Sequence, residues 1–77
     1  MTPQQKNLIK AIDEAYVDVN RILAYEFNTG ISEEAEKREA EGFASGLSSA
    51  YFMIYGDHYL STIEPCDEDN YQKWLTV

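Results

Sequence analysis

The 77-residue sequence contains few of the residues that small proteins use for cross-linking or metal binding. Cys66 is the only cysteine, so no disulfide can form within the chain, and a lone thiol is typical of a reducing compartment. His58 is the only histidine, and together with Cys66 it cannot supply four zinc ligands. We therefore expect no metal and no cofactor, and a small core supported by helix packing or self-association.

Long apolar runs are also absent. The first seven residues lack the apolar segment of a secretory signal, and the longest apolar stretch, residues 50–55, is far too short to span a bilayer. We therefore expect a cytoplasmic protein with no membrane association. The 44% hydrophobic content and the ten aromatic residues argue against disorder. The length predicts one domain over residues 1–77.

Basic residues are scarce, and the excess of acid is uneven. Six Lys and Arg face fourteen Asp and Glu, which gives a formal net charge of -8. Residues 1–30 hold three bases and four acids, whereas residues 31–77 hold three bases and ten acids. A field of this sign repels nucleic acid and attracts basic surfaces. We therefore predict no direct nucleic-acid binding, because that would require a basic patch.

Recognisable catalytic motifs are missing as well. There is no glycine-rich phosphate loop, and a nucleophile with its base would have to come from Cys66 and His58. Asp57, His58 and Cys66 match no familiar metal-ligand spacing. Surface carboxylates are numerous, but paired-carboxylate chemistry needs a cleft that a short helical chain hardly offers. We therefore expect a protein that is not an enzyme.

The spacing of apolar residues predicts a first helix over about residues 3–28. Thr2 is placed to cap it, Pro3 suits the first helical position, and Gln5 matches a capping box. Gly30 can take the left-handed conformation that ends many helices. The apolar stripe recurs every three or four residues at Leu8, Ile12, Ala15, Val19 and Ile22.

A second helix is predicted over about residues 32–56, with Ser32 as its N-cap and glutamates in its first turns. Its expected core stripe is Phe43, Leu47, Ala50 and Ile54. A connection of about three residues forces the two helices to be antiparallel neighbours. The fold class predicted is all-α, built on an antiparallel helical hairpin.

Small residues in the second helix predict a close helix contact. Interior glycines each cost roughly 1 kcal/mol relative to alanine, so a compensating approach of another backbone is expected. That backbone belongs either to the first helix or to a second subunit, in which case two hairpins form a four-helix dimer. The residues expected in this contact are Gly42, Gly46 and Ala50.

Residues 57–77 form a less regular acidic tail that is expected to pack on the hairpin. Pro65 breaks the preceding segment. Tyr71, Trp74 and Leu75 have helical spacing, which predicts a short helix over about residues 67–76 capped by Asp67. Trp74 and Leu75 are expected to cover the open end of the hairpin.

Two acidic clusters, one within residues 33–41 and one at residues 67–69, make up the predicted partner-binding surface together with several aromatic residues. Part of the first cluster is explained by helix ion pairs, because Glu33 precedes Lys37 and Glu34 precedes Arg38 by four residues. The alternatives to a partner-binding role are that the acids form a solvated helix face and that the tyrosines line the core. Tyrosine and tryptophan beside a charged rim are typical of interface hot spots. The residues predicted to bind a partner are Glu36, Glu39, Glu41, Tyr55, Tyr59, Asp67, Glu68, Asp69, Tyr71 and Trp74.

Two functions from different classes follow from these patterns. In the first, the chain inhibits or sequesters a larger basic protein that handles nucleic acid, such as a nuclease, a CRISPR effector or a polymerase. In size and composition it resembles small acidic phage and mobile-element proteins that block such targets, some of them DNA mimics such as anti-CRISPR proteins. In the second, it is a self-associating helical module with a scaffolding, regulatory or small-ligand-binding role.

Overall fold

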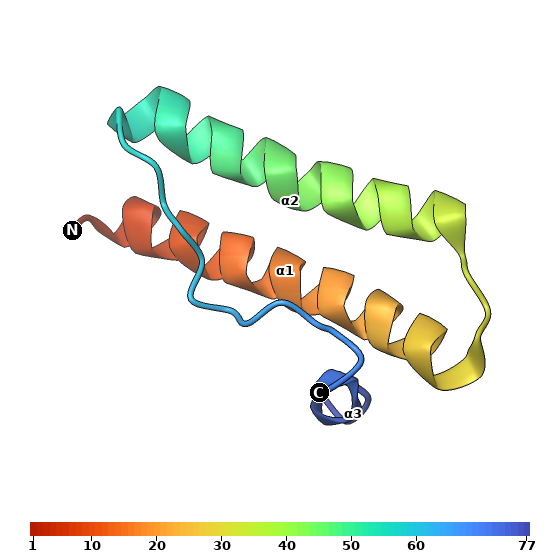
Figure 1. Ribbon diagram of the computed structural model, residues 1–77. Helices are drawn as coiled ribbons and strands as arrows, with labels where there is room; N and C mark the ends of the chain where they lie inside the picture. The colour runs from red at the N-terminus through yellow and green to blue at the C-terminus, as the bar shows by residue number, and fades with distance from the viewer.

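The computed structural model describes all 77 residues and contains three helices and no strand (Figure 1). The helices are α1 (Pro3–Thr29), α2 (Glu34–Tyr55) and α3 (Tyr71–Trp74). Because 53 of the 77 residues are helical, the predicted all-α class is confirmed. No helix has an apolar stretch long enough to cross a membrane.

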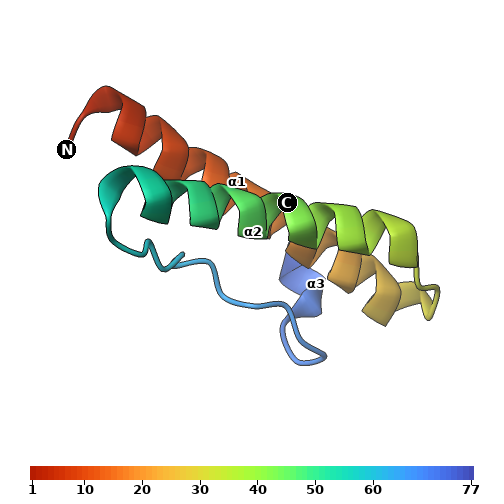
Figure 2. The same ribbon diagram turned by 90° about the horizontal axis from the view of Figure 1, so that it is seen from above.

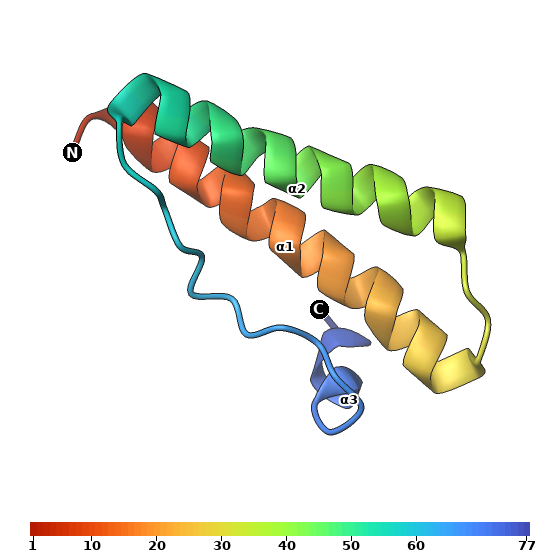
Figure 3. The same ribbon diagram turned by 45° about the horizontal axis from the view of Figure 1, so that its top comes forward.

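The two long helices lie side by side, and α2 runs back along α1 (Figures 1 and 3). Residues 56–70, named here the strap, leave the end of α2, cross α1 and lead to α3. Figure 2 shows the strap and α3 on one side of the helix pair. The molecule measures 40 × 23 × 15 Å, and only eight residues are buried. Such a thin molecule leaves most faces of its helices open.

The ends of α1 follow the capping signals of the sequence. The Thr2 hydroxyl accepts a hydrogen bond from the Gln5 backbone N–H at 3.1 Å. Gly30 closes the helix at φ 73°, and its N–H donates to the Glu26 carbonyl at 2.8 Å. The side chain of Gln5 does not complete a capping box, because its amide donates to the Tyr51 hydroxyl on α2 at 2.9 Å.

The start of α2 differs from the prediction. Ser32 is not the N-cap, because its hydroxyl donates to the Glu34 carboxylate at 2.5 Å, and Glu33 stands at the cap position without a side-chain cap bond. A hydrogen bond to a charged acceptor is stronger than one between neutral groups, which favours this alternative. The helix ends at Gly56 (φ 71°), where the sequence predicted its end.

The core-facing side of α2 was predicted only in part, because Leu47 and Ala50 of the expected stripe are half-buried but Phe43 and Ile54 are not. Ala44 and Tyr51 are its buried residues, whereas Phe43 is 62% exposed and Ile54 is 65% exposed. Polar pairs with α1 hold the helix in this rotation: Gln5 bonds Tyr51, and Tyr16 lies 3.4 Å from Ser48. Since α2 is apolar on two adjacent faces, these pairs decide which one packs.

The glycines of α2 make no close contact. A Cβ built at Gly42 or Gly46 would meet nothing within 4 Å, so the expected approach of α1 to these residues does not occur. The space beside them is open because α2 is rotated toward the stripe that contains Ala44.

The C-terminal helix is shorter than predicted. Only Tyr71–Trp74 is helical, because the Asp67 carboxylate accepts from the N–H groups of Asp69 and Asn70, both at 2.9 Å, and closes a turn there instead. The resulting helix contacts α1 and not α2. Trp74 packs near Ala24 in the second half of α1, so it does not cover the open end of the helix pair.

Candidate interaction surfaces

Most of the acidic side chains have no basic partner. Five of the fourteen acids take part in ion pairs, and the other nine do not. The nine include all six acids that the sequence predicted as partner-binding, and these six are exposed: Glu36, Glu39, Glu41, Asp67, Glu68 and Asp69.

The predicted ion pairs along α2 do not form. Lys37 pairs with Glu26 of α1 at 3.1 Å and with Glu34 at 3.4 Å, and it leaves Glu33 free of a base. Arg38 makes no ion pair. Lys37 therefore serves to join the two long helices, and its hydrogen bond to Glu26 raises the pKa of the ammonium group.

The two acidic clusters do not form one surface. Glu36 and Glu39 line a groove between α1 and α2, whereas Glu41 does not. Asp67, Glu68 and Asp69 lie in the turn before α3, and α3 contacts α1 and not α2. One oxygen of Asp67 is also used to hold that turn. The groove and the turn are therefore separate candidate surfaces.

The groove between α1 and α2 encloses about 620 Å³ and is lined by seven residues: Asp18, Arg21, Ile22, Glu36, Glu39, Ala40 and Phe43. A smaller hollow of about 340 Å³ continues it past Tyr25 and Glu33. None of these residues belongs to the strap or to α3. The groove thus combines an apolar floor with carboxylates along the α2 edge.

Negative charge is concentrated at this edge. A hydrogen bond with Glu33, and then the charges of Glu33 and Glu39, raise the pKa of the Glu36 carboxyl. The only base lining the groove, Arg21, lies 3.4 Å from Asp18 on its own helix. In contrast, hydrogen bonding to Ser32 and the charge of Lys37 lower the pKa of Glu34. The acids on the α2 side of the groove are therefore close together and have no basic partner.

The aromatic residues predicted to contact a partner pack largely inside the molecule. Tyr59 lies on the strap, and its hydroxyl donates to both oxygens of Asp13 at 3.0 Å. Burial, and then Asp13, raise the pKa of Tyr59. The buried Tyr51 ring packs against two of the tyrosines predicted to bind a partner, with ring centroids 4.8 Å from Tyr55 and 5.8 Å from Tyr59.

The remaining two predicted aromatics, Tyr71 and Trp74, hold α3 on α1. The Tyr71 ring stacks on Phe27 with centroids 5.8 Å apart. Trp74 is 8% exposed and packs with Ala24 and Cys66, while its indole N–H has no acceptor. Trp74 is therefore a core residue, and Tyr55, Tyr59 and Tyr71 are half-buried.

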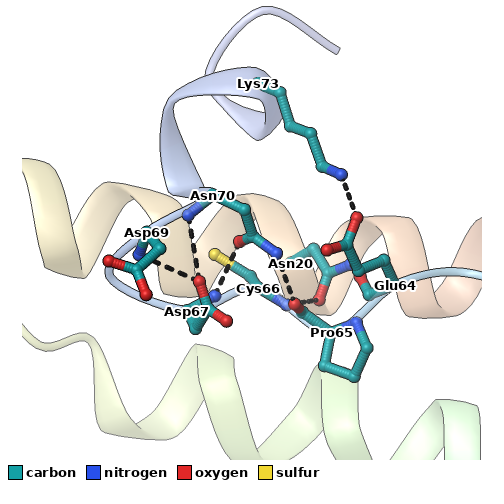
Figure 4. A network of polar contacts seen from close by, with 8 residues as sticks. All are labelled: Asn20, Glu64, Pro65, Cys66, Asp67, Asp69, Asn70 and Lys73. Carbon is teal, nitrogen blue, oxygen red and sulfur yellow. Dashed lines mark hydrogen bonds and ion pairs between the residues drawn. The ribbon is translucent and has the colours of Figure 1, made fainter.

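Sequence reasoning missed the residue that fastens the strap, Asn20. It is 4% exposed, its amide donates to the Glu64 carbonyl at 2.8 Å, and its oxygen accepts from the Cys66 N–H at 3.1 Å (Figure 4). The Asn20 amide thereby supplies hydrogen-bond partners to two backbone groups of the strap, which has no neighbouring strand to bond them. The only signal in the sequence is an amide among apolar residues of α1.

A second part of the same network holds the turn before α3. Asn70 accepts from the Asp67 N–H and donates to the Pro65 carbonyl, and Lys73 pairs with Glu64 (Figure 4). The hydrogen bonds from Lys73 and Asn70 lower the pKa of Glu64. These contacts fix the acids of residues 67–69 on a defined turn.

Cys66 and His58 have different surroundings and form no contact with each other. Burial, and then Asp67, raise the pKa of the Cys66 thiol, which reduces its nucleophilicity at neutral pH. His58 stacks on Phe52 at the end of α2 with centroids 4.3 Å apart. No three His, Cys, Asp or Glu side chains come together in a way that could hold a metal ion.

The chain matches no protein-family model, and no curated protein or solved structure is significantly similar to it.

Proposed function

We propose that this chain is a non-enzymatic acidic interaction protein that binds, and inhibits or sequesters, a larger basic protein that handles nucleic acid. The observation that carries the proposal is the set of nine carboxylates without a basic partner. A protein of net charge -8 attracts a basic surface at long range, and this attraction accelerates association and weakens with salt.

The spacing of the groove acids supports mimicry of nucleic acid. Glu33, Glu36 and Glu39 follow one another every three residues, which corresponds to a rise of about 4.5 Å along a helix. Phosphates on one strand of duplex DNA are about 3.4 Å apart along the axis. The target class is therefore a nuclease, a CRISPR effector or a polymerase, as for inhibitors encoded by phages and mobile elements. The proposed setting is the cytoplasm, where a lone thiol stays reduced.

The test is capture of a partner by the tagged chain from a host-cell lysate, with elution by a salt gradient. We expect a basic nucleic-acid-handling protein that elutes at moderate salt and binds its nucleic acid less well when the chain is added. The control variant changes six acids to their amides: Glu36, Glu39, Glu41, Asp67, Glu68 and Asp69. Equal capture by this variant, or no partner at low salt, contradicts the proposal.

A self-associating module is the second candidate, and the open face of α2 favours it. Met53 is 82% exposed, Phe43 and Ile54 are also exposed, and Gly42 and Gly46 face open space. Two antiparallel hairpins packed through Gly42, Gly46 and Ala50 would form a four-helix dimer. Light scattering after size exclusion tests this candidate. A dimer mass that Gly46→Leu converts to a monomer mass supports it, and a monomer mass in the parent chain contradicts it.

A further inference from the structure

We propose that the groove between α1 and α2 receives a basic amphipathic helix of the partner. This inference rests on the proposed function and adds the docking face and the shape of the partner element. The docking face consists of the apolar residues Ile22, Ala40 and Phe43 and the acidic residues Glu33, Glu36 and Glu39.

The groove offers contact area that the fold itself leaves unused. Phe43 is 62% exposed although the next residue, Ala44, is buried, and Ile22 and Ala40 are half-buried beside it. The strap and α3 lie on α1 away from this groove, and no residue of either lines it. An apolar floor bounded by polar residues is the usual form of a protein contact site.

The charges along the groove select a basic occupant. Glu33, Glu36 and Glu39 have no ion pair, and Arg21 is the only base that lines the groove. Crowding of these carboxylates raises the pKa of Glu36, so a neighbouring cation would relieve repulsion that is present in the free chain. Lysine or arginine side chains of a partner supply that cation.

A second copy of the chain fits this groove poorly. A twofold interface places the same patch of both protomers in contact, so the glutamates of the two α2 helices would meet each other. Each copy also carries a net charge of -8. Like charges at an interface oppose association.

The backbone of the occupant is expected to be helical. The structure contains no strand, and α1 and α2 offer an extended peptide no sheet edge with which to pair. A helix satisfies its own backbone and can place apolar residues at i, i+3, i+4 and i+7 along the floor. Its basic residues then lie beside the α2 glutamates.

A titration of the full-length chain with a synthetic peptide tests the inference. The peptide is a leucine–lysine amphipathic helix, the control peptide is a scramble of the same composition, and binding is followed by amide chemical shifts. We expect shifts concentrated around Ile22, Ala40 and Phe43. Binding should weaken about tenfold or more with Phe43→Ser, as on loss of an interface anchor. It should weaken similarly with the double change Glu36→Gln and Glu39→Gln.

Matched variants separate the groove from general charge attraction. Glu14→Gln with Asp57→Asn removes the same charge at exposed acids outside the groove, and Leu60→Ser removes another apolar side chain that is 83% exposed. Neither should weaken binding. The inference is overturned if both double charge variants weaken peptide binding equally. It is also overturned if the scrambled peptide binds equally well, or if the chemical-shift changes centre on residues 67–69. A concentration-dependent doubling of mass with shifts at Phe43 overturns it too, and would identify a second copy as the occupant.

The outcomes distinguish this inference from the proposed function. Groove-specific peptide binding without capture of a nucleic-acid-handling protein supports the docking face and contradicts the function. Capture that is lost with Glu68→Gln and Asp69→Asn, but kept with Phe43→Ser, supports the function and overturns the docking face.

Discussion

Replacing Asn20 with alanine should release the strap from α1. The substitution removes both side-chain hydrogen bonds and leaves the Glu64 carbonyl and the Cys66 N–H without their partner. A buried polar group left unpaired costs about 1–3 kcal/mol, whereas alanine gains roughly 0.5 kcal/mol in helix propensity over asparagine. For two such groups the net loss is about 1.5–5.5 kcal/mol, a large part of the roughly 4–12 kcal/mol expected for a 77-residue domain.

The two parts of the molecule can be followed separately in urea. Trp74 is the only tryptophan and is buried with Cys66 against α1, so its fluorescence reports docking of the C-terminal segment. Circular dichroism at 222 nm reports mainly α1 and α2. For Asn20→Ala we expect the fluorescence midpoint to fall further than the dichroism midpoint, because strap contacts are lost before the helix pair separates.

The control is Asn7→Ala, the same substitution at an exposed position of α1 that forms no side-chain hydrogen bond. This variant gains helix propensity without losing a hydrogen bond, so its free energy of unfolding should be unchanged or slightly higher. Similar midpoints for Asn7→Ala and Asn20→Ala would refute the assignment of Asn20 as the residue that holds the strap.

The conservative variant Asn20→Asp adds a pH test. Burial raises the pKa of an aspartic acid at this position above its ordinary value of about 3.9. The protonated carboxyl can donate to Glu64 and accept from Cys66, as asparagine does, whereas the carboxylate cannot donate. Relative to the parent chain, its stability should therefore fall as pH rises through the raised pKa. A stability difference that does not change with pH would contradict the two-bond geometry.

Three further predictions concern the core, the open helix face and the strap. Ile12→Ala should lower the free energy of unfolding by about 2–5 kcal/mol because Ile12 is fully buried, whereas Phe43→Ala should cost much less in the same urea titration. Gly46→Ala should raise stability by about 0.5–1 kcal/mol, seen as a higher melting temperature, because the added methyl group meets only open space. The raised pKa of Tyr59 means that the folded state favours the neutral phenol, so stability should fall as pH rises above about 10; Tyr59→Phe should reduce this fall in alkaline urea titrations.

Each of these predictions has a contrary outcome. Equal destabilisation by the Ile12 and Phe43 variants would mean that the Phe43 face of α2 packs on α1 after all. A lower melting temperature for Gly46→Ala would indicate a close contact at that glycine. An unchanged alkaline profile for Tyr59→Phe would exclude Tyr59 as the source of the pH dependence.

The sequence by itself determined the helices, their main ends and the charge of the surface. The helix ends are set by Thr2, Gly30 and Gly56, which bond backbone groups within a few residues. Because these contacts are local, the sequence alone predicts them. The charge excess follows from composition alone, and the six predicted acids are exposed to water, three of them on α2 and three in the turn before α3. Ser32 and Asp67 are the exceptions, since a neighbouring glutamate competes for the Ser32 hydroxyl and the Asp67 carboxylate closes a turn before α3.

Tertiary structure alone decided which faces pack and which remain open. The rotation of α2 depends on Gln5 meeting Tyr51, and the path of the strap depends on Asn20 meeting Glu64 and Cys66, which lie 44 and 46 positions away in the sequence. Periodicity cannot choose between two adjacent apolar faces, because both satisfy the same helical repeat. The polar pairs between distant residues make that choice, and by turning Ala44 inward they leave Phe43 in the groove.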